Sequence, residues 1–127
     1  MDINVDIHTV DFNDMLEDAD FISIHTPSIG KPLLDTEAFS KMKDGVVIIN
    51  CSRGDVMDES ALLAALDSGK VAGAGLDVFQ NEPTPQKALL THPSVSLTPH
   101  IGASTNEAQN KIGVELATKL IEALTKK

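Results

Sequence analysis

The segment Val46-Val47-Ile48-Ile49-Asn50-Cys51-Ser52-Arg53-Gly54 decides the fold of this chain. Its first four residues are β-branched and apolar, a pattern that predicts a strand buried on both faces inside a parallel sheet. The polar residues that follow begin where this strand is expected to end. Ligands of open α/β sheets lie beyond the carboxyl ends of the strands, so the segment also indicates where a functional site would lie.

Outward from this segment, short apolar stretches alternate with helical patterns. We expect strands at residues 5–10, 21–25, 46–49, 71–78 and 95–97, and helices at residues 12–19, 36–42, 58–66 and 106–124. This alternation predicts βαβ units, and hence an α/β fold with a three-layer, mainly parallel sheet of about five strands. The strand order is expected to be that of a half-Rossmann sheet or flavodoxin-like, and residues 1–127 are expected to form a single domain.

The composition argues against several classes of protein. The chain has 127 residues, a net charge of −9 and only 3% aromatic residues, which makes nucleic acid an unsuitable partner. No apolar stretch approaches the ~18 residues of a membrane span, and the first residues do not resemble a signal peptide, so no membrane partner is expected. The single cysteine, Cys51, cannot form an internal disulfide and favours a reducing, cytoplasmic location.

Polar signatures follow four of the expected strands. The residues concerned are His25, Arg53, Asp77, Glu82 and His100. Because the carboxyl ends of parallel strands meet at one edge of a sheet, we expect these side chains along one rim. A single coincidence of this kind would mean little, but four in succession indicate a site.

Three of these residues suit the oxidation of an alcohol beside a carboxylate. Arg53 can bind a carboxylate in a bidentate way, although an arginine here can also make a simple surface contact. His100 can exchange a proton with a substrate oxygen, and Glu82 can pair with its ring. A hydrogen-bonded loop histidine and a turn carboxylate fit the spacing equally well. The hydride would need a cofactor, since no side chain accepts one.

Other constellations receive less support from the sequence. Asp77 can accept a hydrogen bond from an amide such as that of nicotinamide, but a cap or turn is the simpler explanation. The four histidines are scattered without zinc-type pairing, so no metal site is expected. The Gly-x-Ser-x-Gly context of a serine nucleophile is missing around Ser52. We interpret Cys51 as a packed residue at a strand end.

Longer motifs in the chain resemble a known family. They are Asp20-Phe21-Ile22-Ser23-Ile24-His25-Thr26-Pro27, residues 47–54, Asp58-Glu59-Ser60-Ala61-Leu62, Gly75-Leu76-Asp77-Val78-Phe79 with Glu82-Pro83, and Thr98-Pro99-His100-Ile101-Gly102-Ala103-Ser104-Thr105 with Glu107-Ala108-Gln109. In this order, over about residues 12–124, they resemble the cofactor-binding domain of the NAD-dependent D-2-hydroxyacid dehydrogenases. The last motif is most similar to the branch of that family that acts on D-3-phosphoglycerate.

The resemblance implies a role for each matching position. Arg53 would bind the substrate carboxylate, His100 would be the catalytic acid/base, and Glu82 would be its carboxylate partner. The positions that would line the dinucleotide are Thr26, Cys51, Ser52, Arg53, Asp77, His100 and Gly102, with Asp77 at the nicotinamide. The implied reaction is the reversible oxidation of a small D-2-hydroxy acid to a 2-keto acid, with NAD as the cofactor.

The chain also departs from the family pattern. It has no Gly-x-Gly-x-x-Gly turn and no following acidic residue for the adenosine ribose, since Gly30 is its first glycine. We therefore expect weak or absent NAD binding and no turnover by this chain alone. The alternative is a non-catalytic folded module that folds or oligomerises. A general flavodoxin-like binding module is supported only by size and by the alternation of elements.

The first expected strand, residues 5–10, lacks its neighbours in the doubly wound strand order. We expect it to pair with residues 21–25 through a right-handed crossover. Otherwise the edge at residues 21–25 is exposed, and we expect two chains to form a homodimer through it.

Overall fold

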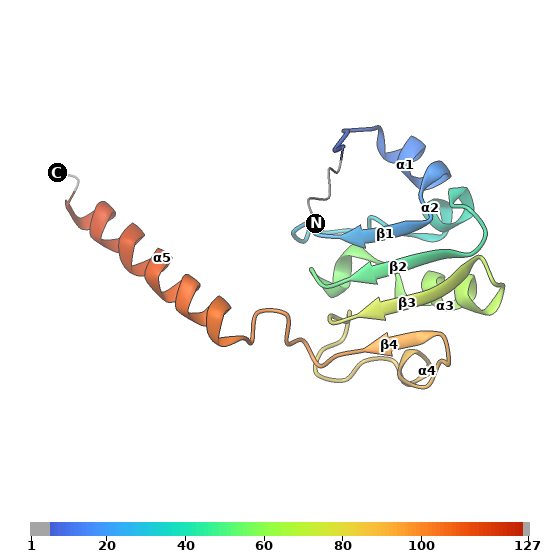
Figure 1. Cartoon of the computed structure of the whole chain (residues 1–127). Helices are drawn as coiled ribbons and strands as arrows, with labels where there is room; N and C mark the ends of the chain where they lie inside the picture. Colours follow the sequence, from blue (N-terminus) through green and yellow to red (C-terminus); the bar gives the residue numbers. More distant parts are fainter. Residues whose placement is uncertain (1–5, 126–127) are drawn as a thin grey trace, which may run out of the picture.

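The computed structural model describes residues 6–125, which form a four-stranded parallel sheet with helices against it (Figure 1). The strands β1 (Phe21–Ile24), β2 (Val46–Asn50), β3 (Val71–Leu76) and β4 (Val95–Leu97) lie side by side in chain order. The helices are α1 (Phe12–Asp18), α2 (Thr36–Lys41), α3 (Glu59–Asp67), α4 (Lys87–Leu90) and α5 (Asn106–Thr125), with a short 3-10 turn, η1, at Gly54–Val56. The predicted α/β class and parallel, Rossmann-like sheet are confirmed, and the flavodoxin-like order is not found among the described strands.

The order of the strands explains why the helices cover one face of the sheet. Crossovers between parallel strands are right-handed, so strands in sequential order place successive crossovers on the same face. Ile22 and Ile48 point to that face and are buried, whereas Phe21 and Ile49 on the opposite face are 73% and 38% exposed. The three-layer arrangement and the strand buried on both faces are therefore wrong for residues 6–125, where the second face of the sheet is open (Figure 1).

The core lies between the covered face of the sheet and helices α1–α4. Leu16 of α1, Phe39 of α2, Leu62 of α3 and Leu89 of α4 are buried there in one cluster with Ile48 of β2. Burying one such side chain contributes about 1.5–3 kcal/mol. The shared core holds the sheet and these four helices together, and so fixes the edge at which the strands end.

Aspartates begin three of the helices. The side chains of Asp11, Asp35 and Asp58 precede α1, α2 and α3, and each accepts a backbone N–H of the first turn at 2.9 Å. Gly69 follows α3 with a φ of 77°, the left-handed conformation that glycine adopts at helix ends. These local signals set the ends of the elements that carry the site.

The expected first strand is wrong where the structure describes it. Residues 6–10 form no strand and are exposed, so they do not pair with β1, and Val5 lies outside the described residues. The described sheet consequently has four strands rather than about five. Ile7 and Val10 are the only large apolar side chains in this segment, too little apolar area to offset the ordering of the backbone.

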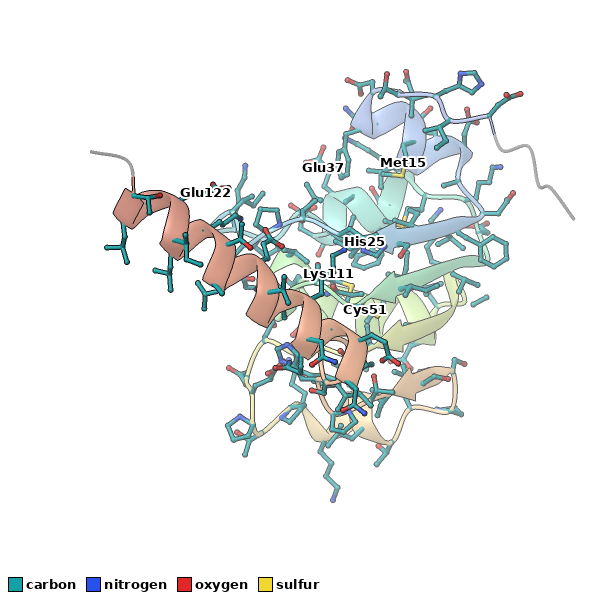
Figure 2. All side chains as sticks on the ribbon, turned by 60° about the vertical axis from the view of Figure 1, so that its left-hand side comes forward. Met15, His25, Glu37, Cys51, Lys111 and Glu122 are labelled. Carbon is teal, nitrogen blue, oxygen red and sulfur yellow. The ribbon has the colours of Figure 1, made fainter. Side chains whose placement is uncertain are left out.

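The last helix, α5, extends away from the sheet (orange in Figure 1). None of its residues is buried, although Ile112, Leu116, Leu120 and Leu124 have the spacing of an apolar helix face. Figure 2 shows this helix from another side, where it projects past the body of the molecule. Neither α5 nor any other helix of residues 6–125 is long and apolar enough to cross a membrane.

Candidate functional site

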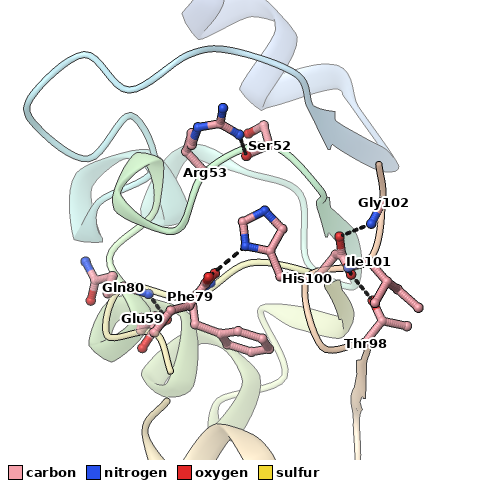
Figure 3. A network of polar contacts seen from close by, with 11 residues as sticks. Ser52, Arg53, Glu59, Phe79, Gln80, Thr98, His100, Ile101 and Gly102 are labelled. Atoms are coloured by element: carbon pink, nitrogen blue, oxygen red, sulfur yellow. Dashed lines mark hydrogen bonds and ion pairs between the residues drawn. The ribbon is translucent and has the colours of Figure 1, made fainter. Parts of the chain in front are cut away.

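The carboxyl ends of the four described strands lie at the same edge of the sheet, because the strands are parallel. His25 follows β1, Cys51 follows β2, Asp77 follows β3, and His100 lies shortly after β4. The expected rim therefore exists, and Figure 3 shows its polar residues from β2 onward. Its geometry decides which of the predicted residues act together.

His100 and Glu82 form a hydrogen-bonded pair on this rim. His100 Nδ1 lies 2.7 Å from Glu82 Oε2 (dashed line in Figure 3). The hydrogen bond with His100, supported by another from the backbone N–H of Phe79, lowers the pKa of the Glu82 carboxyl. An ionised carboxylate can only accept hydrogen bonds, so Nδ1 carries the proton. Nε2 of His100 is then the ring atom left to exchange a proton with a ligand.

Asp77 holds the turn that carries His100. Its Oδ1 accepts hydrogen bonds from Thr98 Oγ1 at 2.5 Å and from the Ile101 N–H at 2.9 Å, and its Oδ2 accepts from the Gly102 N–H at 2.8 Å. His100 has a φ of 53°, a left-handed conformation that is uncommon for residues other than glycine. Two of these bonds come from the residues directly after His100, so Asp77 stabilises the backbone conformation that aims the imidazole.

The Asp77 carboxyl is ionised although it is only 3% exposed. Burial raises its pKa, but the hydrogen bonds from Thr98, Ile101 and Gly102 together outweigh burial and leave the pKa below its ordinary value. A side chain at Gly102 would place its Cβ 3.0 Å from Asp77 Oδ2, so this position favours glycine. Oδ2 accepts one bond from the turn and has capacity for another. The predicted contact of Asp77 with a cofactor stays a prediction.

Arg53 shares a hollow with the His100–Glu82 pair. The hollow, about 270 Å³ in volume, is lined by Arg53, Gly54, Asp55, Val78, Phe79, Gln80, Glu82 and His100. Arg53 is exposed and donates from Nη1 to the Ser52 carbonyl at 2.6 Å, which uses one of its five N–H donors. The structure therefore brings together the three residues predicted to be catalytic: a guanidinium, an imidazole and a carboxylate.

Asn50, which the sequence analysis did not single out, fixes the segment that carries Arg53. It is fully buried at the end of β2, and its Nδ2 donates to the Arg53 carbonyl at 2.9 Å. Its Oδ1 accepts from the N–H and Oγ of Ser52 at 3.1 and 3.0 Å. An Asn side chain can bond the backbone two residues further on, so an Asn directly after a β-branched strand was the available signal.

The remaining predicted cofactor residues lie on the rim without joining this group. Thr26 is half-buried, and its Oγ1 is buried without a hydrogen-bond partner among residues 6–125. Cys51 is exposed, with a free thiol. His25 has its Nε2 2.8 Å from Ser23 Oγ of its own strand. The roles of Thr26 and Cys51, and that of Ser52 beside Asn50, in holding a cofactor stay predictions.

Glu59, the first residue of α3, is a buried carboxylate whose role the sequence analysis missed. It is 1% exposed, and its Oε1 accepts the Gln80 N–H at 2.7 Å. Burial raises the pKa of this carboxyl, although the bond from Gln80 opposes the change. Glu59 shares a helix face with Leu62 and Leu66, which are buried, so the spacing already placed it toward the core.

The described residues do not converge on a metal centre. No group of three or more His, Cys, Asp or Glu side chains within residues 6–125 is arranged to hold a metal ion.

Sequence comparisons identify the relatives of the chain. Residues 2–102 match the family model described as D-isomer specific 2-hydroxyacid dehydrogenase, NAD binding domain. The chain is 45% identical over 120 residues to D-3-phosphoglycerate dehydrogenase of Bacillus subtilis (strain 168), which covers 93% of this chain and 23% of that protein. It is 44% identical over 123 residues to hydroxypyruvate reductase of Thermotoga maritima, which covers 93% of this chain and 40% of that protein.

A solved structure extends the similarity to the fold. The crystal structure of a glyoxylate reductase from Paecilomyes thermophila matches with a TM-score of 0.87 and 40% sequence identity. The match covers 92% of this chain and 36% of that one. The chain thus spans less than half the length of each of these three proteins.

Proposed function

The chain belongs to the D-isomer specific 2-hydroxyacid dehydrogenase family, as its NAD-binding domain, and we propose that its rim supplies the proton-exchanging and carboxylate-binding groups of such an enzyme. The proposed reaction is the reversible, NAD-dependent oxidation of a D-2-hydroxy acid to a 2-keto acid. The observation that carries the proposal is the 2.7 Å pair of His100 and Glu82 in a hollow that Arg53 also lines.

Each of the three residues has a separate task in this proposal. The Arg53 guanidinium binds the substrate carboxylate through two parallel N–H donors, which places the neighbouring hydroxyl at His100. Nε2 of His100 accepts the hydroxyl proton, while Glu82 stabilises the imidazolium that forms. NAD supplies the acceptor for the hydride that leaves the carbinol carbon, a role no side chain can take. In the reverse direction His100 returns the proton to the 2-keto oxygen.

The residues of the rim fit one end of the cofactor better than the other. Thr26 presents a buried hydroxyl without a partner among the described residues, and Asp77 retains capacity for one more bond, so both can hold an amide such as that of nicotinamide. A pyrophosphate needs a glycine-rich turn at a helix N-terminus. The only closely spaced glycines in this sequence, Gly73 and Gly75, lie inside strand β3. We therefore propose that the chain alone binds NAD weakly and does not turn over substrate.

We propose D-3-phosphoglycerate as the substrate of a protein that contains this domain. Support comes from the 45% identity to a D-3-phosphoglycerate dehydrogenase over nearly the whole chain. The similar identity to a hydroxypyruvate reductase keeps a smaller acid as the competing substrate. Arg53 and His100 recognise the carboxylate and the neighbouring 2-hydroxy or 2-keto oxygen that all these substrates share, so they do not distinguish among them.

Titration with NADH, followed by amide signals in NMR spectra of the full chain, tests the cofactor proposal. Signals from residues 26, 51–53, 77 and 100–102 are expected to shift between micromolar and millimolar NADH. Signals from His92 are expected to stay unchanged, because this residue precedes β4 and lies at the amino ends of the strands, away from the rim. Shifts confined to that opposite edge, or none at millimolar NADH, would overturn cofactor binding at this rim.

The substrate proposal is tested by adding 3-phosphoglycerate, hydroxypyruvate and glyoxylate separately to the NADH-saturated chain. Arg53→Gln is expected to abolish the shifts that each acid causes at His100, because the carboxylate loses its bidentate partner. Lys43→Gln, which removes a cation before β2, is the matched control. Equal shifts in both variants would remove Arg53 from substrate binding. Turnover by the unaltered chain would contradict its proposed inactivity.

The second candidate function is a non-catalytic module that associates with itself. Phe21 in the edge strand β1 is largely exposed, and the described sheet pairs β1 on one side only. Two chains that join along this edge would form a homodimer. We propose this association as compatible with either function. We also propose a cytoplasmic location, which a lone, exposed Cys51 thiol favours.

A further inference from the structure

Glu59 lies outside the proposed catalytic group, yet it touches the turn on which that group depends. This turn, residues 79–82, follows strand β3 and ends at Glu82. Glu59 Oε1 accepts the backbone N–H of Gln80 at 2.7 Å (Figure 3), across the boundary between α3 and the rim.

We propose that Glu59 is a positioning residue that holds the 79–82 turn and thereby places Glu82 against His100. The inference rests on the proposed function only in treating the His100–Glu82 pair as the proton-exchanging group. The contact itself, and its effect on Glu82, stand independently of any cofactor.

The two N–H groups at the start of the turn are held by two different carboxylates. The Phe79 N–H donates to Glu82 Oε1 at 3.0 Å, and the following N–H, of Gln80, donates to Glu59. The other oxygen of Glu82 lies 2.7 Å from His100 Nδ1. Glu82 therefore closes the turn through the Phe79 N–H, and Glu59 anchors the turn to helix α3. Loss of the anchor frees the peptide that sets the position of Glu82.

Close packing on the other side of the turn adds to this restraint. A Cβ on Gly54 would lie 2.0 Å from the carbonyl carbon and oxygen of Phe79, so η1 runs directly against the turn. The turn is held between η1 and the first residue of α3. Both elements belong to the chain segment that also carries Arg53. Glu59 thus links the positions of the guanidinium and of the acid/base pair through one short segment, residues 53–59.

A carboxylate at this position costs more than core packing alone would require. Glu59 Oε2 is buried without a hydrogen-bond partner among residues 6–125. Burial and the neighbouring Asp58 carboxylate raise the pKa of Glu59. An apolar residue would fill the same helix face beside Leu62 and Leu66 without this cost. A buried carboxylate without full hydrogen bonding is expected where function requires it. Here only a hydrogen-bond acceptor can hold the Gln80 N–H.

The test measures the titration of Glu82 by carboxyl ¹³C NMR in the full chain, with the amide signals of Phe79 and Gln80. The groups that face Glu82 are His100, Asp77 and the Phe79 N–H. Glu59→Asp keeps the charge but is one methylene too short to reach Gln80, and Glu59→Ala removes the acceptor altogether. Glu59→Gln keeps an acceptor oxygen in the same place. Asp58→Ala weakens the cap of α3 while leaving the Gln80 contact intact.

The proposal predicts that Glu59→Asp and Glu59→Ala raise the titration midpoint of Glu82 toward its ordinary value and shift both amide signals. Glu59→Gln is expected to restore the midpoint, and Asp58→Ala is expected to leave it unchanged despite lower stability. An unchanged midpoint in a folded Glu59→Asp or Glu59→Ala chain overturns the proposal, as does failure of Glu59→Gln to restore it. If the Asp and Ala variants do not fold, the unaltered chain provides the test. The proposal is overturned if the Gln80 and Glu82 signals do not change as Glu59 titrates. None of these outcomes depends on NADH binding.

Discussion

Asp77 and Glu82 are the two carboxylates whose ionised forms the rim stabilises, and this gives stability a pH dependence. Their ordinary pKa values are 3.8 and 4.5, and in the folded chain both are lower. Each carboxylate contributes stability that is fully present above the unfolded pKa and is lost as the pH falls through the folded one. The free energy of unfolding, measured in urea, is expected to fall below pH 4.5. A value that stays constant as the pH falls well below 3.8 would contradict both assignments.

Asp77→Asn tests the anchor of the His100 turn directly. The variant replaces one accepting oxygen by an amide that cannot accept, and the bonds it loses are charge-assisted. The free energy of unfolding at neutral pH is expected to fall by about 1–3 kcal/mol. Asp18→Asn, at the exposed end of α1, is the control and is expected to change it by less than about 0.5 kcal/mol. Equal losses in the two variants would show that Asp77 does not anchor this turn.

Glu59 is expected to give a pH dependence of the opposite sign. Its folded pKa lies above the ordinary value of 4.5, so its contribution to stability is largest below that pH and falls as the pH rises through the folded pKa. Glu59→Gln removes the ionisation and keeps the acceptor for Gln80. The stability of the variant relative to the unaltered chain is therefore expected to rise from acidic to neutral pH in urea denaturation. A difference independent of pH would show that Glu59 is not a buried titrating group.

Sequence patterns identify some residues of the site and miss others. The residues that they miss act through contacts that depend on tertiary packing. Arg53 and His100 follow apolar strands, so the rule for strand ends locates them without any tertiary information. Asn50 and Glu59 act through hydrogen bonds to backbone atoms whose positions depend on how the elements pack. Their polarity gave no sign of burial, although the spacing of Glu59 with Leu62 did. Patterns find groups that face a ligand better than groups that hold other groups in place.

At the scale of elements, η1 can lie against the 79–82 turn only because residue 54 is glycine. The obstruction to a Cβ there is the backbone of Phe79, which cannot move aside like a flexible side chain. Gly54→Ala is expected to destabilise the chain by at least the ~1–3 kcal/mol typical of overpacking. Gly113→Ala in α5 has nothing within 4 Å of its new Cβ and is expected to stabilise the helix by about 0.5–1 kcal/mol. Thermal denaturation followed by circular dichroism measures both; a harmless Gly54→Ala would contradict the packing.

Elements with a strong apolar pattern were predictable, and weak ones were not. Strand β2 and helix α3 occur where their patterns place them, because local preference and burial agree. Helix α4 has four residues and no local signal, and it forms around the buried Leu89. Residues 6–10 show the reverse case, a weak alternation that no packing supports. The apolar face of α5 was predictable, but its spacing does not indicate what that face packs against.

For the whole molecule, the open face of the sheet marks where prediction from sequence ends. The residues of Val46–Asn50 match a strand covered on both faces, and nothing within them reports that only one face is covered among residues 6–125. Layer number depends on which other elements are present and on the order of the strands. The family, by contrast, was recognisable because its motifs are contiguous and each follows a strand.

The free edge of β1 leads to the last prediction, which concerns association of whole chains. The backbone carbonyl of Asp20 accepts the Val47 N–H at 3.0 Å. In a parallel ladder, the backbone groups of alternate residues face the same neighbouring strand. The backbone N–H groups of Phe21 and Ser23 therefore face away from β2, toward an edge with no partner strand in the described structure. A second chain can pair there, against the repulsion of two chains with a net charge of −9 each.

Sedimentation at several protein and salt concentrations is expected to show a dimer that salt strengthens, because ions screen this repulsion. Ser23→Pro removes an outward N–H without disturbing the bonds to β2, so it is expected to abolish the dimer and leave a folded monomer. Leu120→Lys on the apolar face of α5 is the control, because it separates association through the sheet edge from association through the helix. A dimer lost in Leu120→Lys but kept in Ser23→Pro would place the interface on α5. A chain that stays monomeric at high salt would exclude self-association altogether.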